Sequence, residues 1–315
     1  MKLLRNLDQV TDQLRGGAVS IGNFDGVHLG HARIIKKLIK RSKQVEGSSI
    51  VFTFEPHPVR ILRPHQAPPS LTSIERKKEL LEELGVDVMI AFPTDENFLQ
   101  LSSHDFFEQI LLKNLNAKAI VEGPNFFFGH DRLGNVDVMG QFCAAVNIQF
   151  EVVEPFVYNG QIVSSSRIRR AIASGNVADA AAMLTRPYRI HGTVVPGARR
   201  GAKLGFPTAN IDKIDTIMPG PGIYAGQAIV ENKSLPAAIN IGPCPTFDEN
   251  THRIESHILD FDDDIYGANL RVDLLEQLRE IKKFDNVDKM TEQLKLDVQR
   301  TREVLAHISK QGDQQ

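Results

Sequence analysis

The sequence predicts two domains of different class: an α/β domain with a parallel sheet, followed by an antiparallel β-barrel with a terminal α-helix. In the first half, strand and helix patterns alternate, as in a parallel sheet covered by helices. In the second half, short apolar runs are closely spaced and separated by Gly and Pro, which is typical of an antiparallel barrel. The composition changes near Thr185–Tyr188, so we expect domains at residues 1–185 and 186–310.

The first half opens with an apolar run, Ala18–Ile21, that is typical of a buried strand. A glycine-rich turn, Gly22–His31, follows it, and Ala32–Arg41 then carries apolar residues at helical spacing. A capping box at Thr72–Glu75 predicts the start of a second helix, and an apolar stripe predicts another at Phe106–Leu111. Further strands are expected at Ser49–Phe54, Val86–Phe92, Ala119–Val121 and Phe150–Val153.

The second half contains five short runs that we expect to form barrel strands. They are Ile190–Val195, Ile223–Val230, Ala237–Ile241, Ile254–Phe261 and Leu270–Leu275. Between Met290 and Leu305 the apolar residues return to helical spacing, so the chain is expected to end in a helix.

Composition and charge exclude several classes of protein. A net charge of −2 gives no reason to expect a nucleic acid or a membrane surface as partner. No apolar run approaches the roughly 18 residues of a membrane span, and acidic residues stand where a signal peptide needs an apolar core. Cys143 and Cys244 are the only cysteines and lie far apart, which indicates a reducing, cytoplasmic location. The oligomeric state is left open.

The turn Gly22–His31 (GNFDGVHLGH) has the features of a phosphate site. His28 and His31 share one face of the following helix, and Gly30 between them lets a ligand approach the backbone. The free N–H groups and the dipole at a helix N-terminus favour anions. The arrangement resembles the His-x-Gly-His signature of nucleotidylyltransferases. Surface histidines or half of a zinc site are the alternatives, although no further ligand lies at zinc spacing nearby.

Three other segments of the first half contain candidate binding residues. Phe54–Pro58 places His57 in a loop stiffened by two prolines, although such a loop is also an ordinary turn. Gly123–Gly129 sets Asn125 beside three phenylalanines, which suits a planar ring and a phosphate; core packing is the alternative. Ser164–Arg170 places serines and arginines at a helix start, where an anionic partner would offset the arginine charge, unless this is a solvated basic face.

The second half has a basic, glycine-rich loop, Gly197–Gly205, that suits phosphate, although it could be a plain basic loop. Thr208 and Asn210 follow it and point to the same face of an extended segment. Their hydroxyl and amide oxygens suit Mg²⁺ that is held mainly by substrate phosphates. Glu255 could accept a proton from a substrate hydroxyl, or it could be an ordinary ion-paired residue. Asp262–Asp264 is expected to be a solvated turn.

Taken together and in order, these motifs resemble the prokaryotic bifunctional riboflavin kinase/FAD synthetase family over nearly the whole chain. The first half resembles its Rossmann-like nucleotidylyltransferase module, and the second its riboflavin kinase barrel. The motifs that carry the resemblance in the second half are Gly205–Asn210, Asn240–Phe247 and Glu255–Phe261. The resemblance implies that riboflavin and ATP give FMN and ADP, and that FMN and ATP then give FAD and pyrophosphate.

The resemblance also implies roles for individual residues. In the adenylyltransferase module, the ATP phosphates would be bound by Gly22, Asn23, Phe24, Asp25, His28, His31, Ser164, Ser165, Ser166 and Arg167, with the two histidines catalytic. FMN would be bound there by His57, Asn125, Phe126 and Phe128. In the kinase module, ATP would be bound by Gly197, Arg199, Arg200, Gly201, Lys203, Gly205, Pro207 and Thr208. Thr208 and Asn210 would hold Mg²⁺, and Glu255 would be the base.

The chain departs from the family pattern at two positions. Ala202 stands where the family often has Arg, and Phe127 stands where many members carry a polar or basic residue. The first departure keeps open a monofunctional FAD synthetase with a degenerate barrel. A non-catalytic flavin sensor is a second alternative, against which Asn210 and Glu255 argue, because binding flavin requires neither a metal ligand nor a base.

Overall fold

The computed structural model describes residues 1–197, 201–243 and 252–312. The chain forms two compact units, Met1–Pro68 with Thr72–Ser164, and Pro69–Leu71 with Ser165–Gln315. Within the described residues, no helix has the length and apolarity needed to cross a membrane.

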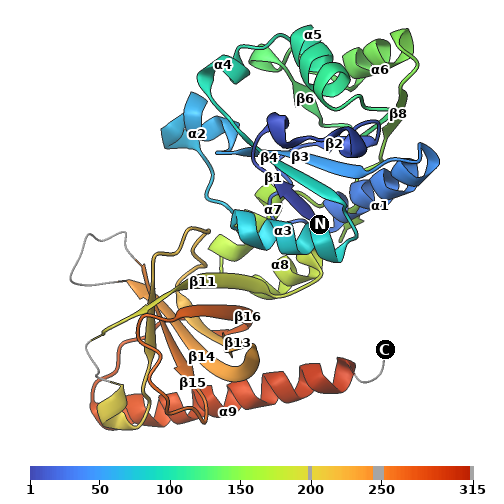
Figure 1. The fold of residues 1–315 in the computed structure, drawn as a ribbon. Coiled ribbons are helices and arrows are strands. Elements are labelled where there is room, and N and C mark those ends of the chain that lie inside the picture. Colours follow the sequence, from blue (N-terminus) through green and yellow to red (C-terminus); the bar gives the residue numbers. More distant parts are fainter. Residues whose placement is uncertain (198–200, 244–251, 313–315) are drawn as a thin grey trace. The chain divides into compact units, whose positions relative to one another are not determined.

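The first unit is built on a six-stranded sheet in which every pairing is parallel, as expected (Figure 1). Its strands, in spatial order, are β1 (Lys2–Leu4), β4 (Val88–Pro93), β3 (Ser49–Glu55), β2 (Ala18–Ile21), β5 (Ala119–Glu122) and β8 (Gln149–Val152). The chain runs outward from β2 through β3 to β4, and then crosses to the other side of β2 to form β5. The strand order therefore reverses between β2 and β5, where ligands bind in open α/β sheets.

Alternate residues of each strand pack into two apolar layers, one on each face of the sheet. Ile35 and Leu38 of α1 (Leu29–Gln44) and Leu80 and Leu81 of α3 (Ile74–Glu83) belong to one layer. The other layer contains residues of η4 (Phe106–Asn114) and of α6 (Val136–Ala145). η4 is a π-helical segment and includes the helix predicted at Phe106–Leu111. Helices on both faces confirm the predicted fold class of this half.

The predicted capping box at Thr72–Glu75 is wrong. Ser73 is the N-cap of α3, and its hydroxyl accepts from the Arg76 N–H. Thr72 instead bonds to the turn after β2, as described below. Smaller elements of this unit escaped the sequence reading: α2 (Pro58–Leu62), α4 (Glu96–Leu99), α5 (Ser103–Asp105), the hairpin β6 (Phe127–Phe128) with β7 (Gly134–Asn135), and the hairpin β9 (Val157–Tyr158) with β10 (Gln161–Ile162).

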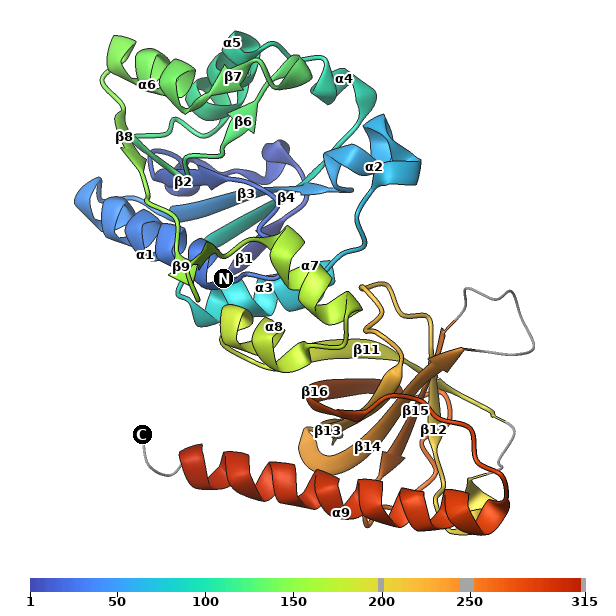
Figure 2. The same cartoon turned by 180° about the vertical axis from the view of Figure 1, so that it is seen from behind.

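The second unit contains a closed antiparallel barrel, as predicted, but with six strands (Figure 2). In spatial order they are β11 (Tyr188–Val195), β12 (Ala209–Asp212), β15 (His252–Ile258), β14 (Lys233–Pro243), β13 (Gly222–Val230) and β16 (Asn269–Arg279). The sequence did not predict β12 as a strand. β15 ends at Ile258, three residues before Phe261, where the predicted strand ends. The residue that turns the chain there, Asp260, has a left-handed backbone with φ of 56°.

Three α-helices accompany the barrel among the described residues. The predicted terminal helix is α9 (Val287–Gly312), which packs along β13, β14 and β16 (Figure 2). α7 (Ser165–Ala173) and α8 (Val177–Leu184) also belong to this unit, and α8 packs on β11 and β16. These two helices precede the domain boundary expected at residue 185, which stays a prediction.

Candidate active sites

The turn after β2 connects the central strand to α1 and lies at the point where the strand order reverses. His28 is the N-cap of α1, and its Nδ1 accepts a hydrogen bond from the His31 N–H at 3.4 Å. The two imidazole rings stack, with centroids 3.7 Å apart and planes 15° from parallel. The predicted pair of histidines is thus brought together at the positive end of a 16-residue helix.

Gly30 is required by this packing of the two rings. A Cβ on Gly30 would lie 3.1 Å from Cε1 of His28 and 3.7 Å from the Val163 carbonyl oxygen. The segment just before Ser164 therefore lies against the start of α1. Ser165, Ser166 and Arg167 begin α7 in the second unit, and their predicted role at the phosphate site stays a prediction.

The turn itself is held in a strained shape. Phe24 and Val27 have positive φ, 45° and 38°, although neither is glycine, and such outliers persist only where surrounding contacts enforce them. Asp25 is buried, and its Oδ1 accepts from both the Thr72 N–H, at 3.1 Å, and the Thr72 hydroxyl, at 3.2 Å. The side-chain oxygen of Asn23 is buried and accepts no hydrogen bond from any residue that the structure describes. This oxygen is thus left available to a ligand.

Two buried ionisable groups border the turn, and sequence reasoning found neither. Glu122, the last residue of β5, accepts the Ile21 N–H at 2.6 Å, and burial raises the pKa of its carboxyl well above its usual value. Lys77 of α3 lies with its Nζ 3.5 Å from the Thr53 hydroxyl. Burial lowers the pKa of Lys77, and the charges of Asp25 and Glu55 oppose this shift.

The residues predicted to bind FMN lie on loops that leave the carboxyl ends of β3 and β5. His57 follows β3 and caps α2, where its Nδ1 accepts the Val59 N–H at 3.1 Å. Asn125 is exposed after β5. Phe126 and Phe128 stack with centroids 5.3 Å apart, and Phe128 lies in the apolar layer of η4 and α6. Phe128 thus anchors the loop in the core, and the FMN-binding role of these residues stays a prediction.

A second candidate site lies on the outer face of the barrel, where three neighbouring strands align polar residues. The register pairs Asn210 of β12 with Glu255 of β15, and Glu255 with Asn240 of β14. The Nδ2 of Asn240 donates to Oε2 of Glu255 at 3.4 Å. His257, two residues further along β15, bonds to the Pro207 carbonyl oxygen at 2.7 Å. Asn240 belongs to a motif that carried the resemblance, but the sequence alone assigned it no role.

The oxygen of Asn210 fits the predicted magnesium site. Asn210 is 6% exposed, and its Oδ1 accepts no hydrogen bond within the described part of the chain. Gly197 packs against this side chain so closely that a Cβ on it would lie 2.2 Å from Nδ2. A buried amide oxygen without a donor, two residues from the Thr208 hydroxyl, matches the hard oxygen ligands of Mg²⁺.

The basic loop is described only in part, since Arg199 and Arg200 lie outside the described residues. Its second half turns through a short 3₁₀ helix, η6 (Ala202–Leu204), which ends at Gly205 with a left-handed φ of 83°. A Cβ on Gly201 would lie 2.3 Å from the Phe206 carbonyl oxygen, so this position requires glycine. Lys203 is exposed.

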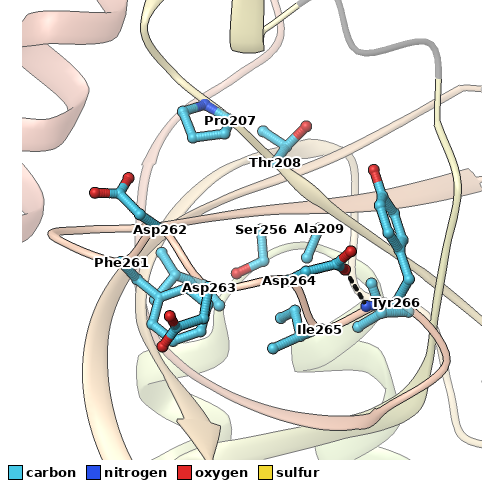
Figure 3. Close-up of a pocket in the computed structure, with 12 residues that line it drawn as sticks. Pro207, Thr208, Ala209, Ser256, Phe261, Asp262, Asp263, Asp264, Ile265 and Tyr266 are labelled. Atoms are coloured by element: carbon cyan, nitrogen blue, oxygen red, sulfur yellow. Dashed lines mark hydrogen bonds between the residues drawn. The ribbon is translucent and has the colours of Figure 1, made fainter.

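A cavity of about 320 Å³ opens beside Thr208 (Figure 3). One wall comes from Pro207, Thr208 and Ala209, and the other from the segment Phe261–Tyr266. Figure 3 shows the aspartates of that segment around the cavity, with the Asp264 carboxylate bonded to the Tyr266 N–H at 2.9 Å. Ser256 also lines it, and its hydroxyl is buried with no hydrogen-bond partner among the described residues.

Asp262–Asp264 is expected from the sequence to be a solvated turn, and all three aspartates are exposed. The same three residues line the cavity, which nothing in the sequence indicated. In the described residues, no three His, Cys, Asp or Glu side chains gather as a metal site.

Comparisons with known proteins cover both halves of the chain. The family model described as FAD synthetase matches residues 10–167, and the one described as riboflavin kinase matches residues 184–305. The bifunctional riboflavin kinase/FMN adenylyltransferase of Buchnera aphidicola (subsp. Schizaphis graminum) is 33% identical over 303 residues, which is 95% of this chain and 97% of the relative. The protein of the same description from Escherichia coli K12 is 32% identical over 305 residues, or 96% and 97%.

A solved structure shares the fold over almost the full length. It is described as a macrolide-efflux protein from Streptococcus pneumoniae, is 30% identical, and has a TM-score of 0.87. The match covers 96% of this chain and 98% of that chain.

Proposed function

The chain belongs to the family of bifunctional riboflavin kinase/FMN adenylyltransferases, and we propose that it makes both FMN and FAD. In the first reaction riboflavin and ATP give FMN and ADP, and in the second FMN and ATP give FAD and pyrophosphate. Its partners are then these small molecules, and we propose a cytoplasmic location. One observation carries the proposal: each compact unit holds its own candidate phosphate-transfer site, built from the residues that match the family's motifs.

We assign adenylyl transfer to the turn after β2. The attacking phosphate of FMN is already ionised, so this reaction needs no general base. Catalysis then depends on alignment and on stabilisation of the charge that moves to the pyrophosphate. His28 and His31, stacked at the N-terminus of α1, are the donors that would meet this charge. The His57 and Asn125 loops would hold FMN across the same edge of the sheet.

We assign phosphorylation of riboflavin to the row Asn210, Glu255 and Asn240. Glu255 would accept the proton of the terminal ribityl hydroxyl as its oxygen attacks the γ-phosphorus of ATP, and ADP would leave. Asn240 donates to the Glu255 carboxylate and so fixes its orientation. Thr208 and Asn210 would hold Mg²⁺, which when bound neutralises charge on the ATP phosphates.

We place the nucleoside of ATP in the cavity beside Thr208. Thr208, one of the two proposed magnesium ligands, lines the cavity, so a phosphate chain could run from the cavity to the metal. The Ser256 hydroxyl, which has no hydrogen-bond partner in the described ranges, and the rings of Phe261 and Tyr266 suit a purine and its ribose.

Product analysis tests the proposal. Purified protein is mixed with riboflavin, ATP and Mg²⁺, and the flavins are separated by chromatography; both FMN and FAD are expected. Only FAD formation from added FMN would indicate a monofunctional synthetase, and flavin binding without either product would indicate a sensor. Omission of Mg²⁺ with a chelator present should abolish FMN formation.

Two variants then assign the sites. His31→Ala should lower FAD formation from FMN by about 10²–10³-fold and leave riboflavin phosphorylation intact. Glu255→Gln keeps the shape of the side chain and removes its basicity, so it should lower FMN formation by about 10²–10⁴-fold and spare FAD formation. Parental phosphorylation by Glu255→Gln would mean that the base lies elsewhere.

A further inference from the structure

We propose that Lys77 is a positioning residue for adenylyl transfer, which holds the turn after β2 in its strained shape and offsets the charge of Asp25. This inference rests on the proposed function of the first unit. Lys77 lies in the middle of α3, and sequence pattern alone gives it no role other than that of an ordinary surface lysine.

The side chain of Lys77 turns inward instead of toward solvent. Only 6% of the residue is exposed, whereas the neighbouring Lys78 is partly exposed. Its Nζ lies 3.5 Å from the hydroxyl of Thr53, a residue of β3 that is fully buried. A lysine is almost never buried without a compensating partner, so its burial here needs a reason.

The contacts of Lys77 lead to the backbone of the turn. The Thr53 hydroxyl that it meets donates to the carbonyl oxygen of Asn23 at 3.3 Å. Asn23 is followed by Phe24, whose φ of 45° is one of the two strained angles in the turn. From α3 through β3, the chain of contacts Lys77–Thr53–Asn23 thus holds the first part of the turn.

The second part of the turn is held by Thr72, which precedes the N-cap of α3. Thr72 binds the Asp25 carboxylate through its N–H and its hydroxyl, and its Oγ1 also accepts the Gly26 N–H at 3.2 Å. These bonds hold the buried Asp25 carboxyl group beside a site that must accept the phosphates of ATP. A buried carboxylate without compensation would repel these phosphates strongly, because charges interact over longer range in a low dielectric.

Lys77 contributes to this compensation. The charge of Asp25 acts on Lys77 more strongly than that of the exposed Glu55, and both favour the charged form of the amine. The ammonium therefore has two tasks, which are to donate within the contacts that shape the turn and to neutralise Asp25. Both tasks serve the geometry of the reaction, and neither requires Lys77 to touch ATP.

A double-mutant cycle in the full-length chain tests this inference. Lys77→Met, Asp25→Asn, the double variant and the control Lys78→Met are each assayed for FAD formation from FMN at varied ATP, and for riboflavin phosphorylation. We expect Lys77→Met to lower kcat/KM for ATP in FAD formation by about 10²-fold, because the charge of Asp25 then displaces the turn and the phosphates, and misplacement of about 1 Å can cause such a loss. In the Asp25→Asn background the same substitution should cost less than tenfold, because the charge that Lys77 offsets is already gone and only its contact with Thr53 is lost. Riboflavin phosphorylation and the Lys78→Met variant should match the parent.

Each other outcome overturns the inference. Parental FAD formation by Lys77→Met would show that the lysine has no role, and equal losses in both backgrounds would show that it acts independently of the Asp25 charge. If Lys77→Met alone does not fold, the double variant must fold and stay within tenfold of Asp25→Asn; failure of the double variant to do so also contradicts the inference. A parent chain that forms no FAD would refute the proposed function itself, so the two failures are distinguishable.

Discussion

Deleting α7 and α8 from the second unit should destabilise the barrel, although no proposed kinase residue is lost. Two fragments test this expectation, one of residues 165–315 and one of residues 186–315. Both contain the Asn210–Glu255–Asn240 row and lack Pro69–Leu71, so they differ only in the two helices. The longer fragment follows the compact unit, and the shorter one follows the boundary expected from the sequence.

The magnitude follows from the buried face of α8. Met183 is 0% exposed and Leu184 is 3% exposed, in a helix that packs on β11 and β16. Complete burial of such side chains contributes about 1.5–3 kcal/mol each, or about 3–6 kcal/mol for the pair, as an upper estimate. α7 adds a backbone hydrogen bond, in which the Gly220 N–H donates to the Ile172 carbonyl oxygen at 3.0 Å. This loss is a large part of a typical stability of about 5–15 kcal/mol.

Thermal unfolding followed by circular dichroism measures the difference. A loss of about 3 kcal/mol corresponds to a Tm lower by about 10 °C for a domain of this size. Both fragments should phosphorylate riboflavin at a temperature well below their transitions. In the full chain, Leu184→Ala should cost about 2–5 kcal/mol, whereas Ala182→Ser at an exposed position of α8 should cost little. Equal Tm values for the two fragments would refute this reasoning and would favour a boundary at residue 185.

Two further variants probe buried charges. Because burial raises the pKa of Glu122, the folded state keeps a proton that the unfolded chain releases above about pH 4.3. The parent therefore loses stability as pH rises through the folded-state pKa. Glu122→Gln retains an acceptor for the Ile21 N–H. Its free energy of unfolding, measured with denaturant, should exceed that of the parent only slightly at pH 4 and increasingly toward pH 8. A difference between variant and parent that stays constant with pH would contradict this. In α9, the carboxylate of Asp297 accepts hydrogen bonds from Nε of Arg279 at 2.9 Å and from Nη2 of Arg279 at 2.6 Å. Only 5% of the Asp297 side chain is exposed. Asp297→Ala should cost about 3–5 kcal/mol in thermal unfolding, whereas Asp285→Ala, at 82% exposure, should change stability by less than about 0.5 kcal/mol; equal losses would refute a special role for the buried pair.

The sequence was sufficient for the features that depend on local pattern. The buried runs of the first half predicted the inner strands of the parallel sheet, because such strands are apolar throughout. The His28–His31 pair could be placed on one helix face because helical spacing is a local property. The predicted N-cap of α3, Thr72, lies one residue before the observed N-cap, Ser73. Both residues carry a hydroxyl group, and only the fold shows that Thr72 bonds to Asp25 instead.

Features that depend on contacts between distant segments could not be predicted in this way. The pairing of Asn210, Glu255 and Asn240 depends on the register of three strands, and the order in which barrel strands pair is not a local property of the chain. Lys77 and Glu122 look like surface residues in the sequence, because a single charged residue in a helix or at a strand end normally faces solvent. Both became visible only when the fold brought them to the turn after β2.

Glycines decide how the departure at Ala202 affects the kinase site. Two described glycines of this loop make close contacts: Gly197 packs on Asn210, and Gly201 packs on the Phe206 carbonyl oxygen. Neither contact involves the side chain at position 202, which is exposed in η6. An arginine there would add charge but is not needed for the path of the loop, and the exposed Lys203 keeps a cation beside it. The substitution therefore changes the charge of the loop and leaves the contacts of Gly197 with Asn210 and of Gly201 with Phe206 unaffected, which supports the proposal that the barrel is an active kinase.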